Sequence, residues 1–399
     1  MRSLVRYIPV AIPIIAAVLA GCQIAPPVAP RVPAAAPRAT FSPMHFDALP
    51  GWRDDRVEAV WPAFLVGCRA LTSAPAMQPI WQAPCAAAIL VNSNDSAAVR
   101  AFFENNFSVY RIGDGDGTDV GLVTGYYEPL LAGARSATEK FRAPLYAVPD
   151  DLLIVDLATL YPELKDKRVR GRIDGRRVVP YWPRADIEHG NPSLAAKAIA
   201  FVADPIDAFF LQIQGSGRIK LDDGSVMRVG YADQNGHPFR SIARVLIERG
   251  ELTPELASKQ AIEAWGRAHP DALPALLDEN PSYVFFREVP PPASGSLDAA
   301  IDGPIGSLGV PLLAERTVAV DARFIPLGAP IFLSTTYPLS SRPLQRLVMA
   351  QDTGGAIRGA TRADFFWGFG DAAGREAGRM RQDGRLWLIW PKNAPLPSS

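Results

Sequence analysis

The chain has 399 residues, in which 41 lysines and arginines balance 41 aspartates and glutamates and 48% of residues are hydrophobic. The balanced charge argues against nucleic acid as a partner, because nucleic-acid-binding domains carry a basic excess. The hydrophobic content supports a packed core, and the length allows two domains or one large domain after the N-terminal segments.

Residues 1–21 are predicted to be a signal peptide. Two arginines precede an apolar run from residue 8 to residue 19, which is shorter than the ~20 residues that cross a bilayer. The sequence Leu-Ala-Gly before Cys22 resembles the bacterial lipobox, which implies cleavage before Cys22 and a lipid on that residue. An ordinary signal peptide with an incidental cysteine is the alternative. Gln23 is not aspartate, which favours an outer-membrane lipoprotein that faces the periplasm.

Residues 22–45 are rich in proline and alanine and cannot build a core, so we expect a semi-extended tether. Beyond Cys22 the cysteines are Cys68 and Cys85. An oxidising compartment favours a disulfide between them, with free buried thiols as the alternative. The histidines show no metal-ligand spacing, so we expect no metal and no cofactor.

The apolar pattern predicts helices, a β-rich middle, more helices and a β-rich end. Apolar residues at helical spacing predict a helix over 53–72, and Asp95 or Ser96 marks the start of a second one. Strands are expected at 107–112 and 120–131, joined by a hairpin turn at 113–117. We expect further strands near 176–182, 199–204, 208–221 and 225–233, helices over 241–249, 254–267 and 271–279, and short strands from 282 onward.

Three segments have the composition of a glycan-binding groove. Tyr126 and Tyr127 adjoin in TGYYEP, and Gln212 and Gln214 occupy alternate positions of an expected strand, hence one face of it. Residues 231–235 add a tyrosine, an aspartate and two amides. Sugars present apolar ring faces and a rim of hydroxyls, which aromatic and amide side chains match. A turn or core role is the alternative for each segment.

Three aspartates near the C-terminus, Asp321, Asp352 and Asp364, fall where an apolar run meets glycine or proline or opens an aromatic run. Burial of an unpaired charge is costly, so a carboxylate at a strand end points to a cleft. A turn role is the alternative for Asp321 and Asp352. Asp364 precedes the aromatic residues 365–367, and a carboxyl in such surroundings tends to a raised pKa, which suits a general acid.

Several long motifs resemble the membrane-bound lytic murein transglycosylase A family, over roughly residues 120–395. They are GYYEPLLAGAR, LQIQGSGRIKLDDGSVMRVGYADQNGHPFRSIARVLIERGEL, NPSYVFFRE, GPIGSLGVPLLAERTVAVDARFIPLG and AQDTGGAIRGATRADFFWGFGDAAGREAG. The resemblance implies a mainly β fold with flanking helices. A double-psi β-barrel would come from residues 46–127 and 237–399, with a smaller β-barrel inserted at 128–236 and a groove between them.

The resemblance also implies site residues. The family's three-aspartate signature matches Asp321, Asp352 and Asp364, with Asp364 as the catalytic residue and the other two supporting the site. The expected substrate-binding residues are Tyr126, Tyr127, Gln214, Gly215, Ser216, Gly217, Gly354, Gly355 and Trp367.

The implied reaction cleaves the β-1,4 bond between N-acetylmuramic acid and N-acetylglucosamine in peptidoglycan without water. Asp364 would protonate the glycosidic oxygen, and the same carboxylate would take the proton of the attacking muramyl 6-hydroxyl, which leaves a 1,6-anhydromuramyl end. The expected partners are glycan strands, the membrane through the lipid on Cys22, and cell-wall synthesis or hydrolysis complexes.

Other interpretations stay open at this point. A β-1,4-glycan hydrolase could use Asp364 with Asp352 or Asp321 as base, and a peptidoglycan-binding lipoprotein could lack catalysis. The triplet from Asp352 to Gly354 resembles that of aspartic proteases, but those need two such triplets and this chain has one.

Overall fold

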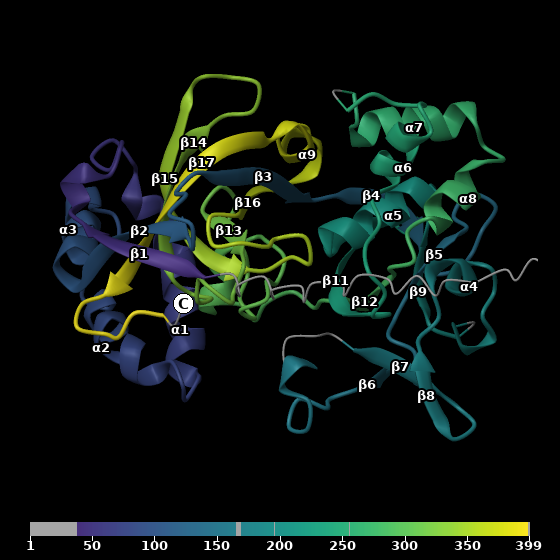
Figure 1. Ribbon diagram of the computed structural model, residues 1–399, viewed down its shortest axis with the longest axis horizontal. Coiled ribbons are helices and arrows are strands. Elements are labelled where there is room, and N and C mark those ends of the chain that lie inside the picture. Colours follow the sequence, from purple (N-terminus) through teal and green to yellow (C-terminus); the bar gives the residue numbers. More distant parts are fainter. Residues whose placement is uncertain (1–37, 165–168, 195, 255, 398–399) are drawn as a thin grey trace, which may run out of the picture. The chain divides into compact units, whose positions relative to one another are not determined.

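The computed structural model describes residues 38–164, 169–194, 196–254 and 256–397. The predicted signal peptide, Cys22 and most of the predicted tether lie outside these residues. Within them no helix has the length and apolar character that a membrane crossing requires. The fold is mainly β with helices beside the sheets, as the sequence predicts (Figure 1).

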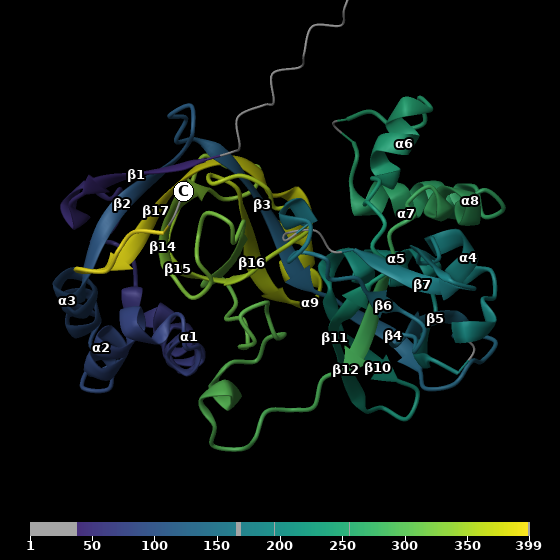
Figure 2. The ribbon, with the colours of Figure 1, turned by 60° about the horizontal axis from the view of Figure 1, so that its bottom comes forward.

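Eight strands form the larger sheet: β1 (Ala39–Met44), β2 (Phe107–Asp114), β3 (Gly121–Glu128), β13 (Thr317–Val320), β14 (Pro330–Thr336), β15 (Pro343–Asp352), β16 (Ala363–Phe369) and β17 (Arg381–Pro391). Their order is β1-β2-β17-β14-β15-β13-β16-β3. Because β17 also pairs with β3, the strands from β17 to β3 close into a barrel-like ring (Figure 2). Two of its pairs are parallel, β13 with β15 and β16 with β3. The double-psi crossing stays a prediction.

The turn at 113–117 does not make the expected hairpin. β2 and β3 do not pair with each other. Both run antiparallel to β17, which pairs with β2 through Trp387–Pro391 and with β3 through Arg381–Gly384. The reason is the length of β17, whose 11 residues span both neighbours. A tight turn therefore joins two strands that share a partner.

In the described part of the chain, three α-helices precede β2: α1 (Trp61–Ser73), α2 (Gln78–Ala88) and α3 (Ser96–Asn106). The expected helix over 53–72 begins later, because residues 57–60 form a 3₁₀ turn and Pro62 suits only the first turn of an α-helix. α3 begins as predicted, since Asp95 accepts two backbone N–H groups of its first turn. The sequence pattern does not predict α2, in which Pro84 interrupts the helical period.

A disulfide joins Cys68 of α1 to Cys85 of α2, whose Cα atoms lie 5.5 Å apart. We expect replacement of both cysteines by alanine to lower the free energy of unfolding by about 3 kcal/mol, because the bond closes a loop with a sequence separation of 17. Denaturant unfolding without reductant measures this loss. Thiol titration of the denatured, unreduced protein that lacks Cys22 should find no free thiol, and two free thiols would contradict the bond.

The second sheet has the strands β4 (Leu130–Ala134), β5 (Ala143–Tyr146), β9 (Ala198–Val202), β10 (Ser216–Leu221), β11 (Val226–Gln234) and β12 (Val284–Glu288). Their order is β12-β11-β10-β4-β9-β5. A separate three-stranded sheet contains β6 (Leu153–Ile154), β7 (Arg170–Asp174) and β8 (Arg177–Pro180). β12 pairs with β11 although it lies beyond residue 236, which is the predicted end of the insertion.

The strand expected over 208–221 is wrong in its first half, which is the helix α5 (Pro205–Gln214). Asp204 caps the helix by accepting the backbone N–H of Ile206, and Gly215 ends it with a left-handed φ of 78°. These end signals prevail over the alternating pattern. Gln212 and Gln214 therefore do not share a strand face.

The remaining α-helices are α4 (Arg184–Glu188), α6 (Ile242–Glu248), α7 (Lys259–Ala268), α8 (Leu273–Asp278) and α9 (Gly370–Arg379). α6 and α8 fall inside the predicted helical ranges, and α7 begins within the range predicted over 254–267 and ends one residue beyond it. α9 falls where only strands are expected, because the buried residues of this helix are the small alanines Ala373 and Ala377, and it packs on β3 and β16. Its Gly374 admits the Tyr127 ring, since a Cβ there would lie 2.8 Å from Tyr127 Cε2.

A buried ion pair ties the N-terminal segment to the barrel-like ring. Arg316 donates from Nη2 to Asp55 Oδ1 at 2.8 Å and from Nη1 to Asp55 Oδ2 at 3.0 Å. Asp55 also accepts the backbone N–H of Leu347 in β15 at 2.6 Å, while Arg316 donates to the Leu347 carbonyl. Both side chains are nearly inaccessible to solvent. The pair fixes the entry to β13, next to the strand that carries Asp364.

Candidate active site

Asp364 is the second residue of β16, which lies between β13 and β3. Its cross-strand neighbours are Ala319 in β13 and Thr124 in β3. The Thr124 hydroxyl donates to Asp364 Oδ1 at 2.5 Å, and Arg362 donates from Nη2 to Thr124 Oγ1 at 2.7 Å. The carboxyl is therefore fixed by two paired strands.

Burial raises the pKa of Asp364 to about 6. The Thr124 hydrogen bond and the Arg362 charge act in the opposite direction, and the charge of Asp352 adds to the rise. A carboxyl with this pKa is partly protonated near neutral pH, which a general acid requires.

Only one of the three aromatic residues after Asp364 shares its side of β16. Phe366 packs against Tyr126, with ring centroids 5.1 Å apart, in a small apolar cluster. Phe365 and Trp367 point to the core of the barrel-like ring, as strand alternation requires. The expected aromatic surroundings of Asp364 thus consist of Phe366 and Tyr126.

Asp352 ends β15 and is the second carboxyl of the site. It accepts hydrogen bonds from the Tyr126 hydroxyl at 3.0 Å and from the backbone N–H and the hydroxyl of Ser307, each at 2.9 Å. Burial raises the pKa of Asp352, while the hydrogen bonds from Ser307 oppose this rise. Burial and the charges of Asp352 and Asp364 raise the pKa of Tyr126. Tyr126 thus lies in the field of both carboxyls.

Asp321 lies after β13 and has a different environment. It accepts from the Arg323 guanidinium and from the backbone N–H of Gly359 at 2.9 Å. Burial opposes ionisation, but these hydrogen bonds lower the pKa of Asp321 below its ordinary value. Gly359 belongs to the loop between Asp352 and β16. Asp321 therefore holds the loop that joins the other two aspartates.

The predicted substrate-binding residues lie in several places. Tyr126 adjoins the carboxyls, while the backbone N–H of Tyr127 donates to Gln214 Oε1 at 3.1 Å and thereby links β3 to α5. Gly215 ends α5, and Ser216 and Gly217 open β10, whereas Gly354 and Gly355 lie in the turn after Asp352.

Trp367 does not lie beside Asp364. It is 7% exposed and donates from Nε1 to Met380 Sδ at 3.2 Å. Gly125 leaves room for this indole, because a Cβ at Gly125 would lie 2.6 Å from Trp367 Nε1. This position supports a core role for Trp367 and gives no support to substrate contact.

Two other predicted groove residues also have internal partners. Gln212 accepts from Arg184 at 2.6 Å, and Asn235 donates to the backbone carbonyls of Trp182 and Pro281. Both side chains are buried. Their amides satisfy buried polar groups of the second sheet and its connections.

Sequence reasoning missed Thr124, Ser307 and Arg362. Thr124 is 240 residues from Asp364 in the chain, and Ser307 is 45 residues from Asp352. Only the strand order brings them together. The one available signal is that Ser307 and Arg362 lie inside the family-like motifs, and Thr124 directly precedes the motif that begins at Gly125.

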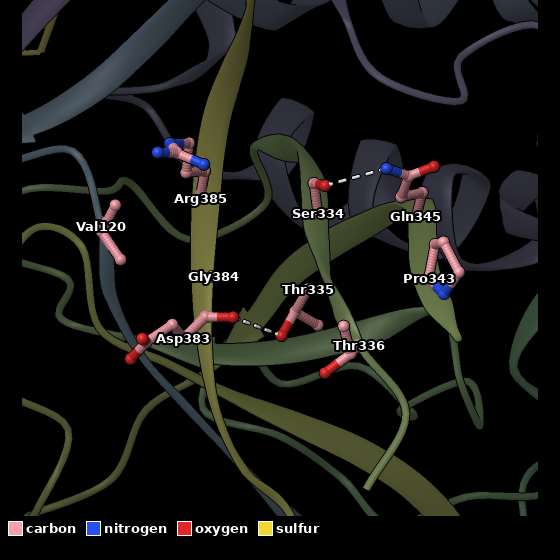
Figure 3. Close-up of a pocket in the computed structure, with 9 residues that line it drawn as sticks. All are labelled: Val120, Ser334, Thr335, Thr336, Pro343, Gln345, Asp383, Gly384 and Arg385. Atoms are coloured by element: carbon pink, nitrogen blue, oxygen red, sulfur yellow. Dashed lines mark hydrogen bonds between the residues drawn. The ribbon is translucent and has the colours of Figure 1, made fainter. Parts of the chain in front are cut away.

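The pocket in Figure 3 is separate from these carboxyls. It has a volume of about 280 Å³ and is lined by residues of β14, β15 and β17 and by Val120, which directly precedes β3. Among the lining residues are Ser334, Thr335, Gln345 and Asp383. Thr335 donates to the Asp383 carbonyl at 2.7 Å, and Gln345 donates to Ser334 Oγ at 3.2 Å. None of the candidate site residues lines it. Among the residues that the structure describes, no three His, Cys, Asp or Glu side chains group as metal ligands would.

The fold and the site define a β-barrel-type protein with a protonatable carboxyl beside a second carboxyl, which suits acid–base chemistry. Residues 122–287 match the MltA specific insert domain, and residues 316–390 match the 3D domain. The chain belongs to the MltA family.

Named relatives agree with this assignment. Membrane-bound lytic murein transglycosylase A of Escherichia coli K12 is 34% identical over 281 residues, which are 68% of this chain and 66% of that protein. The structure of MltA from Neisseria gonorrhoeae (monoclinic form) aligns with a TM-score of 0.77 and 36% identity, over 90% of this chain and 95% of that one. E. coli MltA with bound chitohexaose aligns with a TM-score of 0.61 and 25% identity, over 89% and 92%.

Proposed function

We propose that this protein is a lytic transglycosylase that cleaves the β-1,4 bond between N-acetylmuramic acid and N-acetylglucosamine in peptidoglycan. The observation that carries the proposal is Asp364, a fixed carboxyl with a pKa of about 6. The names of the relatives support the substrate, as does the chitohexaose bound to E. coli MltA. Glycan strands would then lie along the groove expected between the two β domains, with Tyr126 beside the scissile bond.

In this reaction Asp364 acts alone as acid and base. The protonated carboxyl gives its proton to the glycosidic oxygen, the leaving sugar departs, and positive charge develops at the anomeric carbon. The muramyl 6-hydroxyl attacks that carbon and returns its proton to the carboxylate. The product has a 1,6-anhydromuramyl end, and no water enters. No second carboxylate is needed to activate a nucleophile, since the nucleophile belongs to the substrate.

A hydrolase is the second candidate function, because the carboxyl of Asp352 lies near enough to Asp364 for its charge to act on it. A hydrolase would use the second carboxylate to activate water or to attack the sugar. Mass spectrometry of murein sacculi digested by the purified protein separates the two reactions. We expect muropeptides that lack a reducing end and are lighter by one water than hydrolysis products. Reducing-end products would establish the hydrolase instead, and an absence of any release would favour a binding protein.

We also propose that a lipid on Cys22 anchors the protein to the outer membrane, facing the periplasm. The support is the lipobox-like sequence before Cys22 and the membrane-bound relatives. A Cys22→Ala variant expressed in a Gram-negative host should leave the membrane fraction yet retain activity on soluble glycan strands. If the parent protein itself fractionates as soluble in that host, the anchor is wrong.

A further inference from the structure

Three side chains, which we call the Arg362–Thr124–Asp364 chain, form a directed series of hydrogen bonds. Arg362 Nη2 donates to Thr124 Oγ1 at 2.7 Å, and Thr124 Oγ1 donates to Asp364 Oδ1 at 2.5 Å. A guanidinium has only donors and keeps its charge, so the first bond cannot reverse. A threonine hydroxyl has one hydrogen to give, so the second bond uses it.

The backbone keeps this series in register. Arg362 also donates from Nη1 to the carbonyl of Leu122 at 3.1 Å and to the carbonyl of Ala363. Burial lowers the pKa of Arg362, and the charge of Asp364 raises it again. Thr124 and Asp364 are direct neighbours in the β3–β16 pairing. Groups placed on paired strands keep their geometry better than groups on loops.

The two oxygens of Asp364 are therefore not equivalent. In the described part of the structure, the Thr124 hydroxyl donates its hydrogen to Oδ1 of Asp364. A proton on Oδ1 would face this hydrogen across 2.5 Å or force Thr124 to turn it away from its acceptor. A proton on Oδ2 meets no such conflict.

We propose that Arg362, acting through Thr124, reserves Oδ1 of Asp364 as a hydrogen-bond acceptor, so that Oδ2 carries the catalytic proton. Arg362 and Thr124 are positioning residues. During the proposed reaction the Oδ2–H bond breaks as the proton passes to the glycosidic oxygen, and Oδ2 later takes the proton of the 6-hydroxyl. Thr124 keeps its own hydrogen throughout. The transfer steps rest on the proposed function, whereas the position of the proton does not.

Charged or titratable groups from three neighbouring segments lie near Asp364. They are Arg362 of the approach to β16, Asp352 of β15, and Tyr126 of β3, which donates its hydroxyl hydrogen to Asp352. Loss of the Thr124 hydrogen bond or of the Arg362 charge removes a stabilisation of the ionised form of Asp364. Either loss should raise the pKa of Asp364 further.

Infrared difference spectroscopy of the substrate-free protein across its pH titration tests the proton position. The C=O band of protonated Asp364 is identified by its absence in Asp364→Asn. In Thr124→Val we expect this band to move to higher frequency, because its carbonyl oxygen no longer accepts a hydrogen bond. The titration midpoint should rise by about one pH unit, a tenfold change in the ionisation constant. Thr124→Ser should retain the parent's band and midpoint.

The role of Arg362 is tested by a double-mutant cycle with Thr124. Arg362→Met should raise the midpoint, and Arg362→Lys, which keeps the charge, should raise it less. In the Thr124→Val background, Arg362→Met should add a smaller shift than it causes alone, since part of its effect passes through Thr124. The alkaline limb of kcat/KM should move with the infrared midpoint in each variant, because both report the substrate-free protein, with KM changed less than kcat.

The outcomes separate this inference from the proposed function. An unmoved C=O band, or an unchanged or lowered midpoint, in Thr124→Val would overturn the proton position even if anhydromuropeptides are released. Spectral shifts as expected in a protein that releases no anhydromuropeptide would uphold the proton position and reject the transglycosylase.

Discussion

Asp364→Asn should reduce the release of anhydromuropeptides from murein by ~10²-fold or more, the range typical of lost general acid–base catalysis. The amide keeps the shape of the carboxyl and can still accept from Thr124, but it has no proton to exchange. Binding of chito-oligosaccharides should persist, because Tyr126 and the turn after Asp352 are unchanged. Release rates from sacculi and a separate glycan-binding titration measure the two effects.

The parent's pH dependence should follow the same carboxyl. The proposed reaction requires protonated Asp364 for its first step, and the pKa of Asp364 is raised to about 6. kcat/KM should therefore fall as the pH rises above about 6, with one dominant carboxyl ionisation on the alkaline limb. Asp352→Asn removes a charge that raises the pKa of Asp364, so its alkaline limb should move to lower pH.

Stability provides the control for Asp364→Asn. A carboxyl whose folded pKa exceeds its unfolded value binds more protons in the folded state, so it destabilises the fold progressively as the pH rises through both values. Asparagine has no such titration. The free energy of unfolding of Asp364→Asn, measured relative to that of the parent, should therefore increase as the pH is raised from below the unfolded pKa of this carboxyl to above its folded pKa. An Asp364→Asn protein that still releases anhydromuropeptides near the parent's rate would reject the one-carboxylate mechanism.

The sequence predicts much of this molecule where local signals act. Asp95 starts α3, and the expected positions of α6 to α8 are right, since caps and helical spacing are local properties. The same local signals were available for α5, where Asp204 and Gly215 mark both ends. The alternation of Gln212 and Gln214 nevertheless favours a strand in this segment. Alternation in β16 also indicates that Trp367 faces away from Asp364, so this placement could have been foreseen.

The rest depends on strand order, which no local pattern contains. β2 and β3 both run antiparallel to β17 and hence in the same direction, so the short turn between them gives no hairpin. Thr124 meets Asp364 only because β3 and β16 pair in parallel. Ser307 meets Asp352 because the segment before β13 returns to the end of β15. The sequence identifies the aspartates as candidate catalytic groups. The hydroxyl groups that donate to them can be identified only when the order of the strands is known.

Asp55→Ala should lower the free energy of unfolding by about 3–5 kcal/mol, because it leaves the buried Arg316 guanidinium without its partner. The backbone N–H of Leu347 would also lose its acceptor. Denaturant unfolding followed by tryptophan fluorescence measures the loss. The matched control is Asp47→Ala, which breaks an exposed ion pair with Arg53 and should change the free energy of unfolding far less, because water and salt screen such a pair.

The double replacement of Asp55 by leucine and Arg316 by methionine tests the cause of this loss. It removes both charges and should recover much of the stability that Asp55→Ala loses, because the cost comes from an unpaired buried charge rather than from the missing attraction. Since Arg316 precedes β13 and Leu347 lies in β15, Asp55→Ala should also reduce murein cleavage by disturbing the strands beside Asp364 and Asp352. Equal stabilities of Asp55→Ala and Asp47→Ala would show that the N-terminal segment does not brace the barrel-like ring.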